Sequence, residues 1–120
     1  MPLPHVHRLT RDGAPEPADA APERVLSGSG ISLAWNAFSD PSGRFHTGIW
    51  HAEPGVRAVD YAETELCVIL EGRVRLASDE GSAEFGPGEA FVIAPGFRGS
   101  WECLGSVTKI YAILEPGAAT

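Results

Sequence analysis

The residues of this sequence that could do chemistry are few, and most of them alternate along apolar runs. Glu65 and Cys67 share one side of such a run, Trp101 and Cys103 share one side of another, and Lys109 lies in a third. A carboxylate or an ammonium group is costly to bury unless it meets a hydrogen-bonded partner. These residues therefore predict a polar site inside an apolar shell, with aromatic walls.

Strand alternation supplies further candidates for this site. Successive side chains of a strand point to opposite faces, so Tyr61 and Glu63 share the side of Glu65 if no bulge intervenes. His46 and Trp50 share one face of the run over residues 44–52. The alternative is that the tryptophans only fill the interior of a small fold. The candidate pocket residues are His46, Trp50, Tyr61, Glu63, Glu65, Cys67, Trp101, Cys103 and Lys109.

Lys109 is the candidate partner for a buried carboxylate, because it is the only lysine and lies in a strongly apolar run. We expect its ammonium group to point inward and to pair with Glu65 or Glu63. The alternative is an outward, solvated lysine, since no flanking residue sets which face it takes. An inward pair could be purely structural, or could shift the pKa of a carboxylate for acid–base work.

A metal site would need more ligands than the sequence gathers. Transition metals take about four nitrogen, oxygen or sulfur ligands, and the four histidines form no cluster with metal-ligand spacing in the strand region. We therefore expect no cofactor. The weak alternative is a divalent ion, such as manganese, nickel or zinc, held by His46 and Glu65 with help from Glu63.

The elements that must position these side chains are short strands. The 14 glycines and 10 prolines interrupt the chain at turn spacing, and no segment has helical periodicity. Such a chain predicts an all-β antiparallel barrel or jelly roll. The last two strands are expected to pair as a hairpin across residues 104–106. Strands are expected at residues 31–38, 44–52, 56–61, 65–70, 73–77, 83–85, 90–94, 100–103 and 107–114.

The chain length and the distribution of proline predict one domain with an N-terminal extension. A chain of 120 residues buries a single core. Residues 1–24 hold five of the ten prolines and few large apolar side chains, so this segment is expected to be flexible or exchanged between two copies. The folded domain is expected at residues 25–116, followed by a tail at 117–120.

The net charge and the pattern of apolar residues indicate which classes of partner the chain can bind. The net charge of −7 and the scattered cations argue against nucleic acid, and no apolar run approaches the roughly 20 residues of a membrane helix. Cys67 and Cys103 lie in apolar runs, as free thiols of a reducing cytoplasm do, with a lone disulfide as the alternative. The strands are expected to expose more apolar surface on their outer faces than a single small barrel normally leaves in contact with solvent. This surface predicts a homodimer. The outward residues are expected to be Leu66, Val68, Leu70 and Leu76.

Two motifs resemble those of the cupin family. Residues 65–72 (ELCVILEG) resemble the end of the first cupin motif, and residues 85–89 (FGPGE), followed by a strand and residues 94–96 (APG), resemble the second. Over about residues 25–116 the chain resembles the small single-domain cupins similar to the cupin domain of (S)-ureidoglycine aminohydrolase. This resemblance implies an RmlC-like double-stranded β-helix, which is a jelly-roll barrel.

The metal-binding pattern of that family is matched at only one of its four inward ligands, Glu65. The ureidoglycine aminohydrolase reaction uses manganese in that family. Because three of the four metal-ligand positions are not matched here, the resemblance only weakly implies that this chain has the same activity. The three histidine positions of the pattern fall here on Ala58 and Asp60, or on Val59 and Tyr61, and then on Gly99.

We therefore expect a metal-independent cupin that binds a small metabolite. The ligand would lie between Trp50 and Trp101 and would be oriented by Glu65 and Tyr61. One alternative is a metal-dependent enzyme acting on a small ureido or amino metabolite. Another is a structural or regulatory dimer whose barrel is packed solid.

Overall fold

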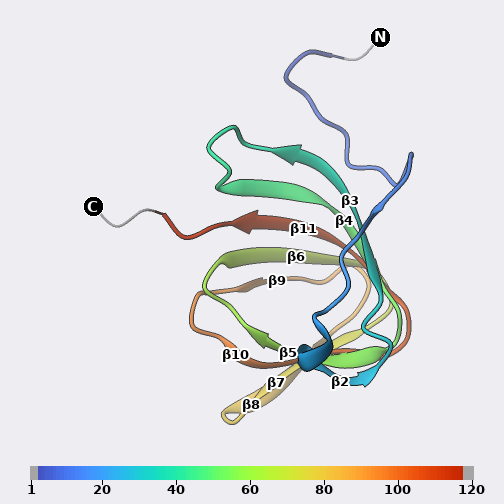
Figure 1. Cartoon of the computed structure of the whole chain (residues 1–120), viewed down its shortest axis with the longest axis vertical. Helices are drawn as coiled ribbons and strands as arrows, with labels where there is room; N and C mark the ends of the chain where they lie inside the picture. The colour runs from blue at the N-terminus through green and yellow to red at the C-terminus, as the bar shows by residue number, and fades with distance from the viewer. Residues whose placement is uncertain (1–2, 118–120) are drawn as a thin grey trace.

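The computed structural model describes residues 3–117, and nearly all of its regular structure is antiparallel β-sheet (Figure 1). Every strand expected from the sequence overlaps an observed strand, so the all-β prediction is confirmed. The short strands β1 and β2 and one 3-10 turn, η1, were not expected. The elements are β1 (Glu16–Pro17), η1 (Pro22–Arg24), β2 (Val25–Gly28), β3 (Ser32–Ser39), β4 (Phe45–Ala52), β5 (Gly55–Asp60), β6 (Thr64–Glu71), β7 (Val74–Ser78), β8 (Gly81–Phe85), β9 (Ala90–Ile93), β10 (Arg98–Cys103) and β11 (Val107–Leu114).

The strands form two sheets. The six-stranded sheet has the order β1-β3-β4-β11-β6-β9, and the five-stranded sheet has the order β2-β5-β10-β7-β8. In Figure 1 the six-stranded sheet runs downward from β3 to β9, and the five-stranded sheet lies below it. Facing sheets of this kind bury one side of each strand between them.

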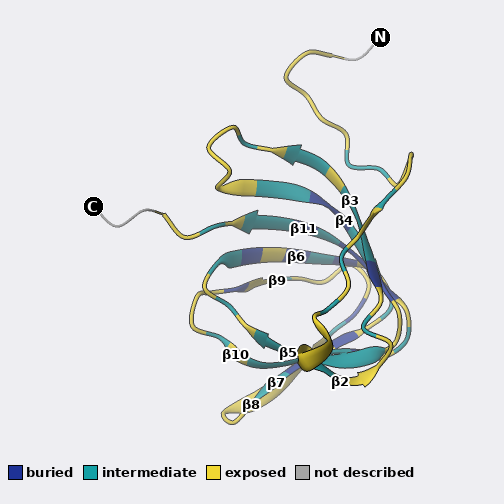
Figure 2. Cartoon of the chain, in the orientation of Figure 1, coloured by how far each residue is buried: buried dark blue, intermediate teal, exposed yellow. Residues whose placement is uncertain are grey.

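The core follows from alternation along the strands. In β6, Glu65, Cys67 and Ile69 are buried, whereas Leu66 and Leu70 are exposed on the other face. Figure 2 shows buried positions within the strands and exposed ones at the tip of the β7–β8 hairpin. The buried apolar cluster consists of Ala52, Cys67, Ile69, Val74, Leu76, Ile93, Trp101, Cys103 and Val107.

Two expectations about the strands were wrong. β10 and β11 do not form a hairpin: β10 pairs with β5 and β7, whereas β11 pairs with β4 and β6 in the other sheet. A three-residue connection serves equally well to cross between sheets. Leu76 faces the core and is only 8% exposed, because Arg73 and Arg75 take the wet face of β7.

The N-terminal segment lies against its own barrel over its described part, and crosses in front of the strands in Figure 1. Residues of β1 pair with β3, and the backbone N–H of Ser32 donates to Asp19 Oδ1 at 3.0 Å. Exchange of this segment between two copies stays a prediction. Among residues 3–117, no helix is long and apolar enough to cross a membrane.

Candidate functional site

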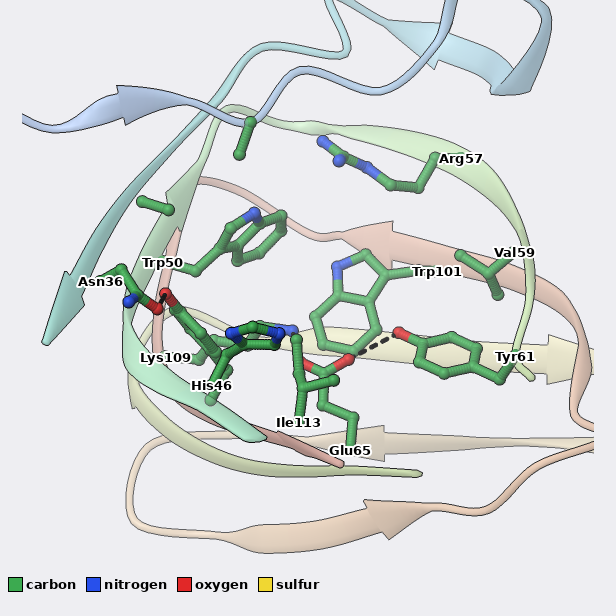
Figure 3. Close-up of a pocket in the computed structure, with 13 residues that line it drawn as sticks. Asn36, His46, Trp50, Arg57, Val59, Tyr61, Glu65, Trp101, Lys109 and Ile113 are labelled. Carbon is green, nitrogen blue, oxygen red and sulfur yellow. Dashed lines mark hydrogen bonds and ion pairs between the residues drawn. The ribbon is translucent and has the colours of Figure 1, made fainter. Parts of the chain in front are cut away.

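A cavity of about 370 Å³ opens between the two sheets (Figure 3). Its floor and walls come from β3, β4, β5, β6, β10 and β11, so it joins strands that are distant in the sequence. In the view of Figure 3, Glu65 lies below the two tryptophan rings and Arg57 lies above them. The lining residues are Ala18, Ala34, Asn36, His46, Trp50, Arg57, Val59, Tyr61, Glu65, Trp101, Lys109, Tyr111 and Ile113.

A buried ion pair forms the floor of this cavity. Lys109 Nζ lies 2.7 Å from Glu65 Oε2, and both residues are 5% exposed. Tyr61 donates its hydroxyl hydrogen to Glu65 Oε1 at 2.9 Å, and Lys109 Nζ also contacts Cys67 Sγ at 3.6 Å. The predicted inward pairing of Lys109 with Glu65 is therefore present, and the alternative of a solvated lysine is wrong.

Two tryptophan rings enclose the ammonium group. Lys109 Nζ lies 4.6 Å from the ring centre of Trp50 and 4.2 Å from that of Trp101. The two rings meet edge to face, with centres 5.7 Å apart. Each ring attracts the cation through its negative face, and this attraction strengthens where water is excluded. The charge of Lys109 is thus balanced by one carboxylate and two aromatic faces.

The ion pair keeps both partners charged in spite of their burial. Burial alone would raise the pKa of Glu65, but the Lys109 charge and the hydrogen bonds from Lys109 and Tyr61 hold it below its usual range. Burial alone would lower the pKa of Lys109, but Glu65 raises it above its usual range. Each group is therefore charged at neutral pH because the other is present.

This coupling predicts how stability depends on pH. The lowered pKa of Glu65 gives stability that is present above its unfolded pKa of about 4.3 and is lost as the pH falls towards the folded value. The raised pKa of Lys109 gives stability that is lost only as the pH rises past about 10.4. Urea unfolding at pH 3, 4, 5 and 7 measures the acid limb.

The matched control for this prediction is the double variant Glu65→Gln/Lys109→Met, which retains every other carboxylate. We expect the difference in unfolding free energy between wild type and this variant to shift in favour of the variant below about pH 4.3. A difference that stays constant from pH 3 to pH 7 would contradict the assignment.

The two cysteines are free and buried behind the cavity wall. Burial raises the pKa of Cys67 to about 12, and burial also raises the pKa of Cys103. Cys103 Sγ accepts a hydrogen bond from Trp101 Nε1 at 3.3 Å. Neither thiol is among the residues that line the cavity, and their part in ligand binding stays a prediction.

The structure does not bring together His46, Glu63 and Glu65, the three residues considered as weak metal ligands. His46 lies at the cavity rim, where Nδ1 contacts Ser39 Oγ at 2.8 Å. Glu63 does not line this cavity but an adjoining shallow depression beside Arg24, which shares Tyr61 and Glu65 with it, and its part in ligand binding stays a prediction. Within residues 3–117, no group of three or more histidine, cysteine, aspartate and glutamate side chains could hold a metal ion.

Gly99 gives a backbone reason why the third histidine of the metal-binding pattern has no counterpart here. A β-carbon at this position would overlap the carbonyl oxygen of Ala77 in the neighbouring strand. A histidine at position 99 would require the backbone of β7 or β10 to move. The residues present at this place in the barrel therefore do not fit the metal of metal-binding cupins.

Comparison with known families agrees with this architecture. The family model described as the EutQ-like cupin domain matches residues 39–111. The chain belongs to the EutQ-like cupin family. The matched residues include Glu65 and Lys109, but not the last three residues of β11 or the N-terminal segment. The cupin resemblance seen in residues 65–72 and 85–96 is confirmed at the level of the family and the fold.

Solved structures similar to this cupin include proteins of unknown function. One from Pseudomonas syringae, of the DUF861 family, is 27% identical with a TM-score of 0.75, and the match covers 88% of this chain and 46% of that one. The chain thus spans less than half the length of that relative. A DUF861 protein from Thermotoga maritima is 31% identical over 52% of this chain and 73% of its own, with a TM-score of 0.50.

A putative ethanolamine utilization protein Q from Salmonella typhimurium shares the fold at 13% identity. Its TM-score is 0.64, and the match covers 87% of this chain and 98% of that one. None of the curated proteins compared with this cupin matches it. The comparisons therefore establish the family and the fold, and the site must be interpreted from its own residues.

Sequence reasoning missed part of the cupin's cavity wall. Arg57 and Val59 line the cavity from β5, and Tyr111 of β11 donates a hydrogen bond to Asn36 Oδ1 of β3 at 2.8 Å, over Gly48 of the strand between them. The signal was available for three of these residues, because alternation from Tyr61 reaches positions 59 and 57, and alternation from Lys109 reaches position 111. Asn36 carried no comparable signal.

Proposed function

We propose that this cupin binds a small metabolite inside its barrel without a metal ion. The observation that carries the proposal is the Glu65–Lys109 contact of 2.7 Å. Glu65 is the one carboxylate that the metal-binding cupin pattern retains, and here a lysine ammonium group is its partner. A cation that is part of the protein thus stands where other cupins would hold an ion.

The cavity has the properties of a small-molecule site. Its volume of about 370 Å³ lies within the range of such sites, which combine apolar walls with a few convergent polar groups. Val59 and Ile113 supply apolar surface, while Tyr61 and Asn36 supply hydrogen-bonding groups beside it. This open volume also argues against a barrel that is packed solid and serves only a structural role.

Native mass spectrometry of the chain purified without chelators tests the proposal. We expect a small organic molecule to co-purify with wild type and to be absent from Val59→Trp, whose larger side chain fills the cavity. Leu26→Trp is the control, because Leu26 is 61% exposed on β2, lies outside the cavity lining and should leave the ligand in place. An identical molecule retained by Val59→Trp would contradict the proposal.

The metal ligands available in this cavity do not favour the activity of ureidoglycine aminohydrolase. That reaction needs a divalent metal, and Glu65 is the single ligand position retained. Its carboxylate oxygens already accept hydrogen bonds from Lys109 and Tyr61. We therefore place metabolite binding ahead of a metal-dependent reaction on a ureido or amino compound.

We also propose that the cupin is a homodimer that pairs through the outer face of its six-stranded sheet. Leu66 and Val92 are direct cross-strand partners on that face and are 42% and 60% exposed. Phe45 and Leu114 form a second exposed apolar pair on the same face. Neighbouring exposed apolar side chains of this kind mark an association surface, and a second copy supplies an equally apolar one.

Light scattering after size exclusion tests the dimer. We expect wild type to have twice the chain mass, and Leu66→Asp/Val92→Asp to have the mass of one chain. Leu26→Asp, a change at an exposed leucine of the other sheet, should remain dimeric. A monomeric wild type would contradict this part of the proposal.

We further propose that the cupin works in a reducing cytoplasm, since both thiols are free and buried. Buried thiols with a raised pKa react slowly because the thiolate is the reactive form. We expect a thiol reagent at pH 8 to label neither cysteine in the folded chain and both in guanidinium chloride. Labelling of neither thiol after unfolding without reductant would indicate a disulfide and contradict the proposal.

A further inference from the structure

Among residues 3–117, Arg57 is the one charged side chain lining the cavity that has no ion-pair partner. It lies on β5 opposite Trp101 of β10, and its guanidinium carbon lies 5.2 Å from the ring centre of Trp50 (Figure 3). Its guanidinium group takes part in none of the ion pairs or side-chain hydrogen bonds found among residues 3–117. Its N–H donors are therefore free to bind a ligand.

The charges around Arg57 make the cavity locally positive. Lys109 and Glu65 neutralise each other on the floor, and within the described part of the chain no other carboxylate lines the cavity. Arg57 thus leaves one uncompensated positive charge in the cavity. The net charge of −7 on the whole chain does not reverse this, because salt screens exposed charges beyond about 8 Å at physiological ionic strength.

From this arrangement we infer that the ligand of the cavity is a small organic carboxylate, held by Arg57. This inference rests on the proposed metabolite-binding function and specifies its ligand class. A guanidinium group presents two parallel N–H donors that match the two oxygens of a carboxylate. A monoanion balances the single free charge of Arg57, whereas a phosphate dianion would leave one negative charge unpaired.

The walls define the rest of the ligand. The anionic end would lie beside Arg57 at the upper side of the cavity, and the body would extend towards the floor between Trp50, Trp101 and Val59. These side chains offer an apolar surface to a compact, uncharged body. Benzoate, a planar carboxylate, and benzamide, its neutral counterpart of the same shape, are therefore matched probes of the charge requirement.

The experiment measures the affinity of both probes by calorimetry for wild type, Arg57→Gln and Arg75→Gln. We expect wild type to bind benzoate at least about tenfold more tightly than benzamide, because a charge-assisted bidentate contact is lost in the amide. Arg57→Gln should abolish that preference while changing benzamide affinity little. Arg75→Gln, which removes an exposed arginine on the wet face of β7, should behave as wild type. Circular dichroism confirms that each variant folds.

The indole N–H signals of Trp50 and Trp101 in NMR spectra separate the possible failures. If benzamide shifts these signals and binds as tightly as benzoate, the carboxylate inference is overturned and metabolite binding stands. If Arg57→Gln keeps the preference for benzoate, Arg57 serves only to stack on Trp50, and the inference is likewise overturned. If neither probe shifts the signals, both the inference and the proposed function are contradicted. Displacement of benzoate by equimolar inorganic phosphate would assign the site to phosphate instead.

Discussion

Replacing Lys109 with methionine is expected to lower the unfolding free energy of this cupin by about 3–5 kcal/mol at pH 7. Methionine has a similar length, so the change removes the charge and keeps most of the packing. It leaves the Glu65 carboxylate buried without a counter-ion, with only the uncharged Tyr61 hydroxyl and Cys67 thiol beside it. An uncompensated buried charge costs far more than the intact pair contributes. Urea unfolding followed by tryptophan fluorescence measures the loss.

The double variant Glu65→Gln/Lys109→Met is the control that separates charge from packing. Glutamine keeps an acceptor for Tyr61 and removes the orphaned charge. We expect the double variant to recover about 2 kcal/mol relative to Lys109→Met, because the two sites are directly coupled. A loss below about 1 kcal/mol in Lys109→Met would contradict the assignment, since that is the size expected of an exposed pair.

Trp101→Ala is expected to cost a similar amount, about 3–5 kcal/mol, for a different reason. Trp101 is 2% exposed and packs against Trp50 and Phe91, with ring centres 5.7 and 6.1 Å away. Its removal leaves a void beside the ammonium group of Lys109 and withdraws one of the two aromatic faces that stabilise it. Thermal and urea unfolding of the variant measure the loss.

Trp101→Phe and Trp35→Ala are the matched controls. Phenylalanine keeps an aromatic face over Lys109 but loses the hydrogen bond to Cys103, so we expect an intermediate loss of about 1–2 kcal/mol. Trp35 is only half-buried, and its Nε1 donates to Gly13 of the N-terminal segment. Its truncation should cost less than that of Trp101. Equal losses in Trp35→Ala and Trp101→Ala would contradict the central place given to Trp101.

Residue alternation accounts for what could be predicted of the site. Glu65 in an apolar run requires a partner, and the only lysine of the chain lies in another apolar run, so the buried pair follows from the cost of isolated charges. The prediction left open which face Lys109 takes. Its register opposite Trp50 in β4 decides this, and that register depends on strand pairing across 59 residues of sequence.

What escaped prediction depends on which strands become neighbours. The connection over residues 104–106 has the length of a hairpin, yet it carries the chain from one sheet to the other. Glu63 shares the parity of Glu65 but lies before β6 begins, where alternation no longer holds, and it lines only the adjoining depression and not the main cavity. Asn36 lines the cavity because β3 pairs with β4, and no local sequence pattern predicts that pairing.

Metal analysis of the untagged chain, purified without chelators, tests the central claim most directly. The claim is that Lys109, and not a metal ion, is the cation beside Glu65. We expect manganese, nickel and zinc to be far below one ion per chain, and Glu65→Gln to leave that content unchanged. One ion per chain in wild type that is lost in Glu65→Gln would contradict the claim.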